Sequence, residues 1–121
     1  MVHKVLIVDD EPNIVISLEF LLKKEGFEVA VAADGEEALA KVAAFAPAVV
    51  LLDVMMPKKS GYEVCQQLKA TPDTAGIKVV MLTAKGRESE VAKGLALGAD
   101  AYVTKPFSTK DLVARVKSLL Q

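Results

Sequence analysis

One apolar run constrains the fold of this chain more than any other feature: Val49-Val50-Leu51-Leu52-Asp53, four aliphatic residues followed by a carboxylate. Such a run, bounded by Pro47 and Pro57, is typical of a strand buried on both faces, as in a parallel sheet. If the strand ends at Leu52, Asp53 lies at the carboxyl edge of the sheet, where open α/β sheets bind ligands. Taken alone, Asp53 serves equally well as a cap of the following turn. Its role therefore depends on the other residues at that edge.

The length and composition indicate an ordinary globular domain. The chain has 121 residues, and we expect one domain over residues 1–121. No apolar run approaches the ~18 residues that a membrane span requires, and the N-terminus has no room for a signal-peptide core. The net charge of −1 gives no general attraction to nucleic acid or anionic lipid. A single cysteine, Cys65, excludes an internal disulfide and favours a cytoplasmic location. We interpret it as a packed small apolar residue or an inert surface thiol rather than a nucleophile.

Five apolar segments alternate with five amphipathic ones. The expected strands are residues 5–8, 27–32, 49–52, 79–82 and 101–103. Two expected helices begin at Pro12 and at about residue 88. The other three begin after the capping residues Asp34, Ser60 and Ser108. The helix expected at 88–97 has few large apolar anchors, so we expect it to be held least firmly. Because short connections allow only right-handed crossovers, these segments predict a doubly wound α/β fold. Its parallel sheet has strand order 2-1-3-4-5 and is sandwiched between helices.

In that strand order, Asp9, Asp10 and Asp53 meet at one edge of the sheet. Two carboxylates about 5 Å apart repel by roughly 3 kcal/mol at an effective dielectric constant near 20, so three such pairs strain a site severely. Either one carboxyl group binds a proton or a cation binds. Oxygen ligands without a nearby His or Cys favour a hard ion, Mg²⁺ first, or Mn²⁺ or Ca²⁺. Since Mg²⁺ commonly binds a phosphoryl oxygen as well, the cluster points to phosphate chemistry.

The remaining strand ends supply two groups that suit a phosphoryl oxygen, Thr83 and Lys105. Each is weak evidence alone, because a Thr after a strand often forms a turn and a Lys usually stays in water. Pro106 restricts the chain after Lys105, although the spacing does not establish a cis bond between them.

Together these positions resemble the receiver domain of bacterial two-component response regulators, over essentially the whole chain. The residues that carry the resemblance are Asp9-Asp10, Asp53, Thr83 and Lys105-Pro106-Phe107. The resemblance implies that Asp53 accepts a phosphoryl group from the phosphohistidine of a sensor histidine kinase or phosphotransfer protein. It also implies that Asp10 and Asp53 bind Mg²⁺ directly, that Asp9 binds it through water, and that the backbone carbonyl of Met55 is a further ligand.

The resemblance further implies how the switch works. Lys105 would pair with the acyl phosphate through a cis bond to Pro106, and the Thr83 hydroxyl would bind the phosphate. Tyr102 would then turn inward to fill the space that Thr83 vacates. Such a protein is not a conventional enzyme. It catalyses its own phosphorylation and dephosphorylation, and the surface over residues 88–120 controls an output domain or partner.

Other classes fit the sequence less well. A flavodoxin-like flavin binder shares this fold, but Asp9-Asp10-Glu11 would repel its phosphate. An aspartate-nucleophile phosphatase normally carries a second acid two residues after the nucleophile, where this chain has Met55. A phosphate-independent interaction module, or pseudo-receiver, remains as the alternative. Such a module would not need the five site residues, so the presence of all five argues against it.

The same resemblance predicts a weak, phosphorylation-favoured homodimer through residues 88–120. Charged residues match positions through which winged-helix regulators of this family pair: Lys93, Asp100, Asp111 and Arg115. Ala101 replaces an acid often found there, so the paired face is incomplete. Sedimentation with a phosphate mimic should show a concentration-dependent dimer. A monomer at every concentration would contradict the prediction.

Overall fold

The computed structural model describes residues 3–54, 60–84, 92–93, 95–105 and 108–120. Its five parallel strands form one sheet of order β2-β1-β3-β4-β5, as predicted. They are β1 (Lys4–Val8), β2 (Glu28–Ala32), β3 (Val49–Asp53), β4 (Lys78–Ala84) and β5 (Ala101–Lys105).

Three strands extend further toward the carboxyl edge than the apolar runs indicated. Asp53 is opposite Leu82 in the β3–β4 pair, and Ala84 is opposite Lys105 in the β4–β5 pair. Parallel pairing therefore continues past the last apolar residue, because it is made by the backbone and does not depend on apolar side chains. Asp53, Thr83 and Lys105 consequently lie within strands, not after them.

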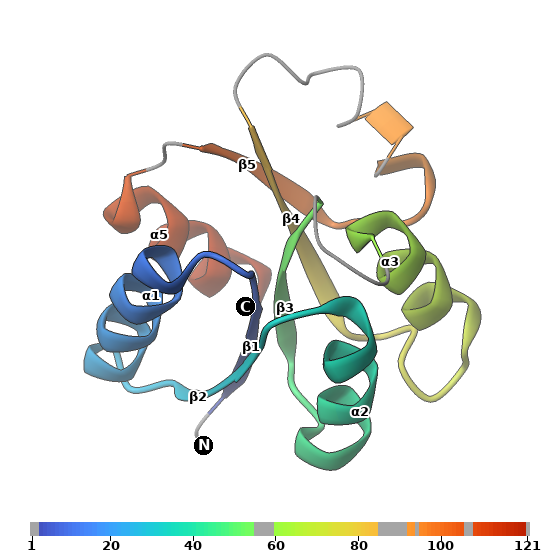
Figure 1. Ribbon diagram of the computed structural model, residues 1–121, viewed down its shortest axis with the longest axis horizontal. Helices are drawn as coiled ribbons and strands as arrows, with labels where there is room; N and C mark the ends of the chain where they lie inside the picture. Colours follow the sequence, from blue (N-terminus) through green and yellow to red (C-terminus); the bar gives the residue numbers. More distant parts are fainter. Residues whose placement is uncertain (1–2, 55–59, 85–91, 94, 106–107, 121) are drawn as a thin grey trace.

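Helices cover both faces of the sheet and complete three layers (Figure 1). One face carries α1 (Pro12–Lys24) and α5 (Thr109–Leu119), and the other carries α2 (Gly35–Phe45) and α3 (Gly61–Ala70). None of the helices in the described part of the chain is long and apolar enough to cross a bilayer.

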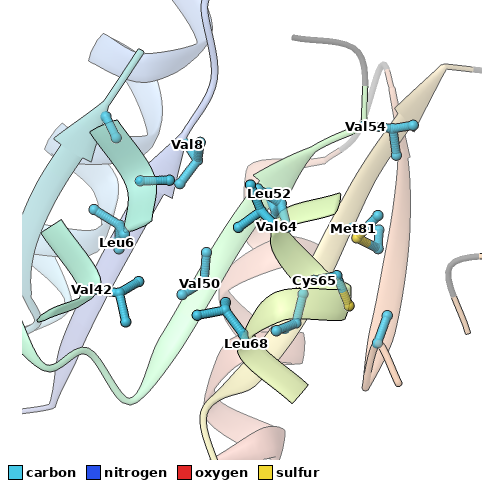
Figure 2. Packing of buried hydrophobic residues seen from close by; sticks show 14 residues of the cluster. Leu6, Val8, Val42, Val50, Leu52, Val54, Val64, Cys65, Leu68 and Met81 are labelled. Carbon is cyan, nitrogen blue, oxygen red and sulfur yellow. The ribbon is translucent and has the colours of Figure 1, made fainter. Parts of the chain in front are cut away.

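The central strands supply both cores, because alternate side chains of a strand point to opposite faces. Figure 2 shows Leu6, Val50 and Leu52 in the core beneath α2 and α3. Their neighbours Ile7 and Leu51 lie in the core beneath α1 and α5. This two-sided burial explains why β1 and β3 read as continuous apolar runs.

Cys65 belongs to the core beneath α2 and α3, where it is fully buried (Figure 2). Burial raises the pKa of its thiol, which keeps the sulfur protonated and unreactive. Of the two alternatives left open for Cys65, the structure therefore shows the packed apolar residue and not the surface thiol.

Three of the predicted helix starts, those after Asp34, Ser60 and Ser108, are confirmed by side-chain caps. The Asp34 carboxylate accepts a hydrogen bond from the Glu37 backbone N–H at 2.8 Å, and Ser60 and Ser108 cap α3 and α5 in the same way. Helix α1 ends at Lys24, and Gly26, two residues later, adopts φ 94°, a conformation that is common just after a helix. Of the helix expected at 88–97, residues 92–93 and 95–96 are helical, while 88–91 and 94 lie outside the described residues.

One helix ends on an unfavourable residue. Ala46, which follows α2, adopts φ 53° and ψ 60°, a left-handed conformation that its Cβ disfavours. The substitution Ala46→Gly should therefore raise the free energy of unfolding by about 0.5–1 kcal/mol, measured by urea denaturation. As a matched control, Ala40→Gly on the exposed side of α2 should lower it by about 1 kcal/mol. Equal destabilisation by both changes would contradict this account.

Candidate functional site

The carboxyl edge of the sheet brings three carboxylates together, as predicted. One oxygen from each of Asp9, Asp10 and Asp53 lies within 4.8 Å of the others. The cause is the parallel register of β1 and β3, in which Val8 is opposite Leu52. The residues that follow this pair, Asp9 and Asp53, therefore reach the same level of the sheet.

The three carboxylates differ in burial. Asp9 is 1% exposed and Asp53 is 5% exposed, whereas Asp10 is exposed to solvent. An Asp9 oxygen, Oδ1, accepts a hydrogen bond from the Glu11 backbone N–H at 2.9 Å. Asp9 is thus a buried, oriented carboxylate, while Asp10 is the most accessible to an ion from solvent.

The donor set fits a hard cation. All three groups offer carboxylate oxygens, which Mg²⁺, Mn²⁺ and Ca²⁺ prefer. Two oxygens bound directly to one Mg²⁺ lie at most about 4.2 Å apart, since each Mg–O distance is about 2.1 Å. The three oxygens, all within 4.8 Å of one another, thus lie close to the spacing that ligands of one such ion require.

Thr83 lies in β4 and is 3% exposed. Its hydroxyl oxygen is fully buried and has no hydrogen-bond partner among the described residues. Leaving such a group unpaired costs roughly 1–3 kcal/mol, so a ligand oxygen within its reach would be bound favourably. β4 adjoins β3, with Leu82 opposite Asp53, so Thr83 lies at the same edge as the carboxylates.

Three further predicted positions lie partly or wholly outside the described residues. Lys105 ends β5 opposite Ala84, at the expected edge, but its side chain is outside the described residues, as are Met55 and Pro106. Tyr102 is 41% exposed, in agreement with its expected resting position at the surface.

Sequence reasoning missed the role of Gly61, the first residue of α3. A Cβ at this position would lie 2.3 Å from the Asp53 carbonyl oxygen and 2.9 Å from Val54 Cα. The Gly61 N–H also donates to the Val54 carbonyl at 3.0 Å. The first turn of α3 is therefore packed on the backbone of Asp53. No local pattern distinguishes this glycine, because the atoms that exclude a side chain belong to β3.

Two charges assigned to a dimer interface are engaged within the chain. The Lys93 ammonium lies 4.7 Å from the Tyr62 ring centroid, and the Asp100 carboxylate pairs with Lys69 at 2.9 Å. The other two, Asp111 and Arg115, are exposed on α5.

Comparisons with known proteins agree with this geometry. The family model of the response regulator receiver domain matches residues 5–117. The phosphate regulon transcriptional regulatory protein PhoB of Rhizobium meliloti (strain 1021) is 45% identical over 121 residues, which are 100% of this chain and 53% of that protein. The chain thus spans about half the length of this curated relative.

Solved structures give the same result. The chemotaxis response regulator CheY4 of Vibrio cholerae superposes with a TM-score of 0.92 at 32% identity, over 98% of this chain and 99% of that one. A CheY-like response regulator receiver domain protein from Methanospirillum hungatei JF-1 superposes with a TM-score of 0.91 at 32% identity, over 99% and 94%.

The contact of Gly61 with Asp53 predicts an unusual response to alanine. Within a helix Ala is normally favoured over Gly, but at Gly61 its Cβ would collide with backbone that has no room to yield. Gly61→Ala should therefore lower the free energy of unfolding by about 1–3 kcal/mol in urea denaturation. Gly76→Ala is the matched control, because its Cβ would meet nothing within 4 Å. A Gly61→Ala protein as stable as this control would refute the close contact.

Proposed function

This chain belongs to the receiver-domain family of response regulators, and from that premise we propose that Asp53 accepts a phosphoryl group from a phosphohistidine. The donor is a sensor histidine kinase or a phosphotransfer protein. The observation that carries the proposal is the group of three carboxylates within 4.8 Å at the carboxyl edge of the sheet. The buried Thr83 hydroxyl at the same edge, which has no hydrogen-bond partner among the residues that the structure describes, supports it.

The reaction uses Asp53 as a nucleophile. One of its carboxylate oxygens forms a bond to phosphorus, while the bond from phosphorus to the imidazole nitrogen of the donor breaks. The bonding electron pair leaves with the imidazole, and the product is an acyl phosphate on Asp53. Burial of Asp53 at the tip of β3 limits the directions from which phosphorus can approach its oxygens.

A divalent cation would offset the charge of the site. Mg²⁺, or Mn²⁺ in its place, supplies positive charge that compensates the carboxylates and the equatorial phosphoryl oxygens. Asp10 and Asp53 would hold it directly. Asp9, whose Oδ1 already accepts the Glu11 N–H, would hold it through water, and the Met55 backbone carbonyl would complete the protein ligands.

Three residues would respond to the phosphoryl group. The Thr83 hydroxyl donates a hydrogen bond to a phosphoryl oxygen, which gives this buried group the partner it needs. Lys105 pairs with the phosphoryl charge. Tyr102, exposed in the resting protein, turns inward as Thr83 moves toward the phosphoryl group. The acyl phosphate is later hydrolysed by water at the same site.

The switch would act on an output domain or a partner protein in the cytoplasm. One curated relative is named a transcriptional regulatory protein, and this chain spans 53% of it, so the output of the whole protein is itself a proposal. A weak homodimer through the surface formed by residues 92–93, β5 and α5 is part of this proposal. The exposed Asp111 and Arg115 support it.

Incubation with acetyl phosphate and Mg²⁺, followed by intact mass measurement, tests the proposal. The wild-type protein should gain the mass of one phosphoryl group, and the gain should disappear with Asp53→Asn or after Mg²⁺ is chelated. Asp73→Asn, which changes an exposed acid remote from the cluster, should leave it intact. No mass gain in the wild-type protein would favour a phosphate-independent interaction module. A gain that persists with Asp53→Asn would assign the modification to another residue.

A further inference from the structure

Helix α3 contacts two charged residues of the segment that leads to β5 and ends just before it. We call residues 92–93 and 95–100 the clamped segment. Near its start, the Lys93 ammonium lies over the ring of Tyr62, in the first turn of α3. At its end, Asp100 pairs with Lys69, in the last turn of α3. Tyr62 and Lys69 are seven residues apart, so they lie two turns apart on the same face of the helix.

The Lys69 end of this arrangement is strongly held. The Lys69 ammonium donates to Asp100 Oδ2 at 2.9 Å and to the carbonyls of Ile77 and Ala75 at 2.8 and 3.3 Å. These three acceptors use all three of its donors. Asp100 Oδ2 also accepts a hydrogen bond from the Val79 N–H at 2.8 Å. The side chains of Lys69 and Asp100 are only 18% and 24% exposed, so solvent competes little with this end.

The stem of Lys69 also packs closely on the clamped segment. A Cβ at Gly98 would lie 2.8 Å from Lys69 Cγ, and Gly98 adopts φ 107°. Both the contact and the backbone conformation therefore require glycine at this turn. The Lys69 end thus combines hydrogen bonds with close packing, and it anchors the segment to α3.

The Tyr62 end is weaker. Lys93 is exposed, and its ammonium contacts α3 through the Tyr62 ring, 4.7 Å from the ring centroid. Contacts of this kind are weak where water reaches the cation. Of the two ends, the one that includes Lys93 is therefore the first to open.

The weaker end is also the end nearer the phosphorylation site. Tyr62 follows Gly61, which is packed against the carbonyl of Asp53 and donates to the carbonyl of Val54. Because Gly61 donates to this backbone and leaves no room for even a Cβ against it, a displacement of Asp53 would be passed to the first turn of α3 and to the Tyr62 ring that it carries.

We propose that α3 is a two-point clamp on this segment, and that phosphorylation of Asp53 releases the Lys93 end while the Asp100 end stays closed. This regulation rests on the function proposed above. It makes Asp100 an internal anchor and not a contact between protomers. It also makes Lys93 available to a partner only in the phosphorylated protein.

A titration with beryllofluoride in the presence of Mg²⁺ tests the clamp, since beryllofluoride mimics a phosphoryl group on a carboxylate. A contact present only in the resting state must weaken binding of the mimic, so its removal must strengthen binding. Tyr62→Leu should bind beryllofluoride about two- to fivefold more tightly than the wild-type protein. Tyr62→Phe, which keeps the ring, is the matched control and should bind it as the wild type does.

The exposed partner gives a second pair of variants that avoids any change in the core. Lys93→Met removes the cation and should give the same gain as Tyr62→Leu, while Lys93→Arg keeps the cation and should give none. The double variant Tyr62→Leu with Lys93→Met should gain no more than either single change. Additive gains would overturn the proposal, because they would show that the two residues act separately.

Nuclear magnetic resonance reports on the contact directly. In the resting protein the Tyr62 ring should shift the Lys93 side-chain methylene protons upfield, and Tyr62→Leu should abolish that shift. Saturation with beryllofluoride should also abolish it in the wild type. Lys69→Met should lower stability without strengthening binding of the mimic, because its end is closed in both states.

The outcomes separate this proposal from the function on which it rests. If the wild type binds beryllofluoride but the Lys93 resonances and the affinity of Tyr62→Leu do not change, the clamp is wrong and the phosphoacceptor role stands. If Lys69→Met strengthens binding as much as Tyr62→Leu, the assignment of the fixed end is wrong. If the wild type binds no beryllofluoride, both the proposed function and the clamp fail.

Discussion

The repulsion among three carboxylates at the carboxyl edge is the constraint on which the rest of the site depends. Asp9, Asp10 and Asp53 are held within 4.8 Å of one another although like charges favour separation. They remain together because β1 and β3 are fixed by side chains buried on both faces, so the strand tips cannot separate without exposing the core. Core burial thus holds the three carboxylates close enough to share one cation, whose charge would offset their repulsion.

The position of α3 connects this strained edge with a distant surface. Its first residue has no side chain and packs on Asp53, while its last turn holds Asp100 through Lys69. Between these ends lies the fully buried Cys65, which fixes the helix on the core. The same helix therefore carries a weak contact, with Lys93, at the end nearer Asp53 and a firm one, with Asp100, at the far end, and the proposed switch opens only the first.

Much of the fold could be predicted from local sequence patterns, because strands, helix starts and connections each depend on residues close together in the chain. Continuous apolar runs marked the buried strands, the caps at Asp34, Ser60 and Ser108 marked helix starts, and short connections restricted the strand order. The ends of β3, β4 and β5 were placed too early because pairing between backbones extends beyond the apolar residues.

The sequence by itself determined the alternating elements, the strand order and the meeting of Asp9, Asp10 and Asp53, because each depends on residue type, spacing and chain handedness. Only the tertiary structure decided that Gly61 must lack a side chain, that the Thr83 hydroxyl is buried with no partner in the described part of the chain, and that Lys93 and Asp100 are engaged by α3. These properties depend on distances between residues far apart in the chain, as with the 31 positions that separate Lys69 from Asp100. Packing sets such distances, and no local pattern records them.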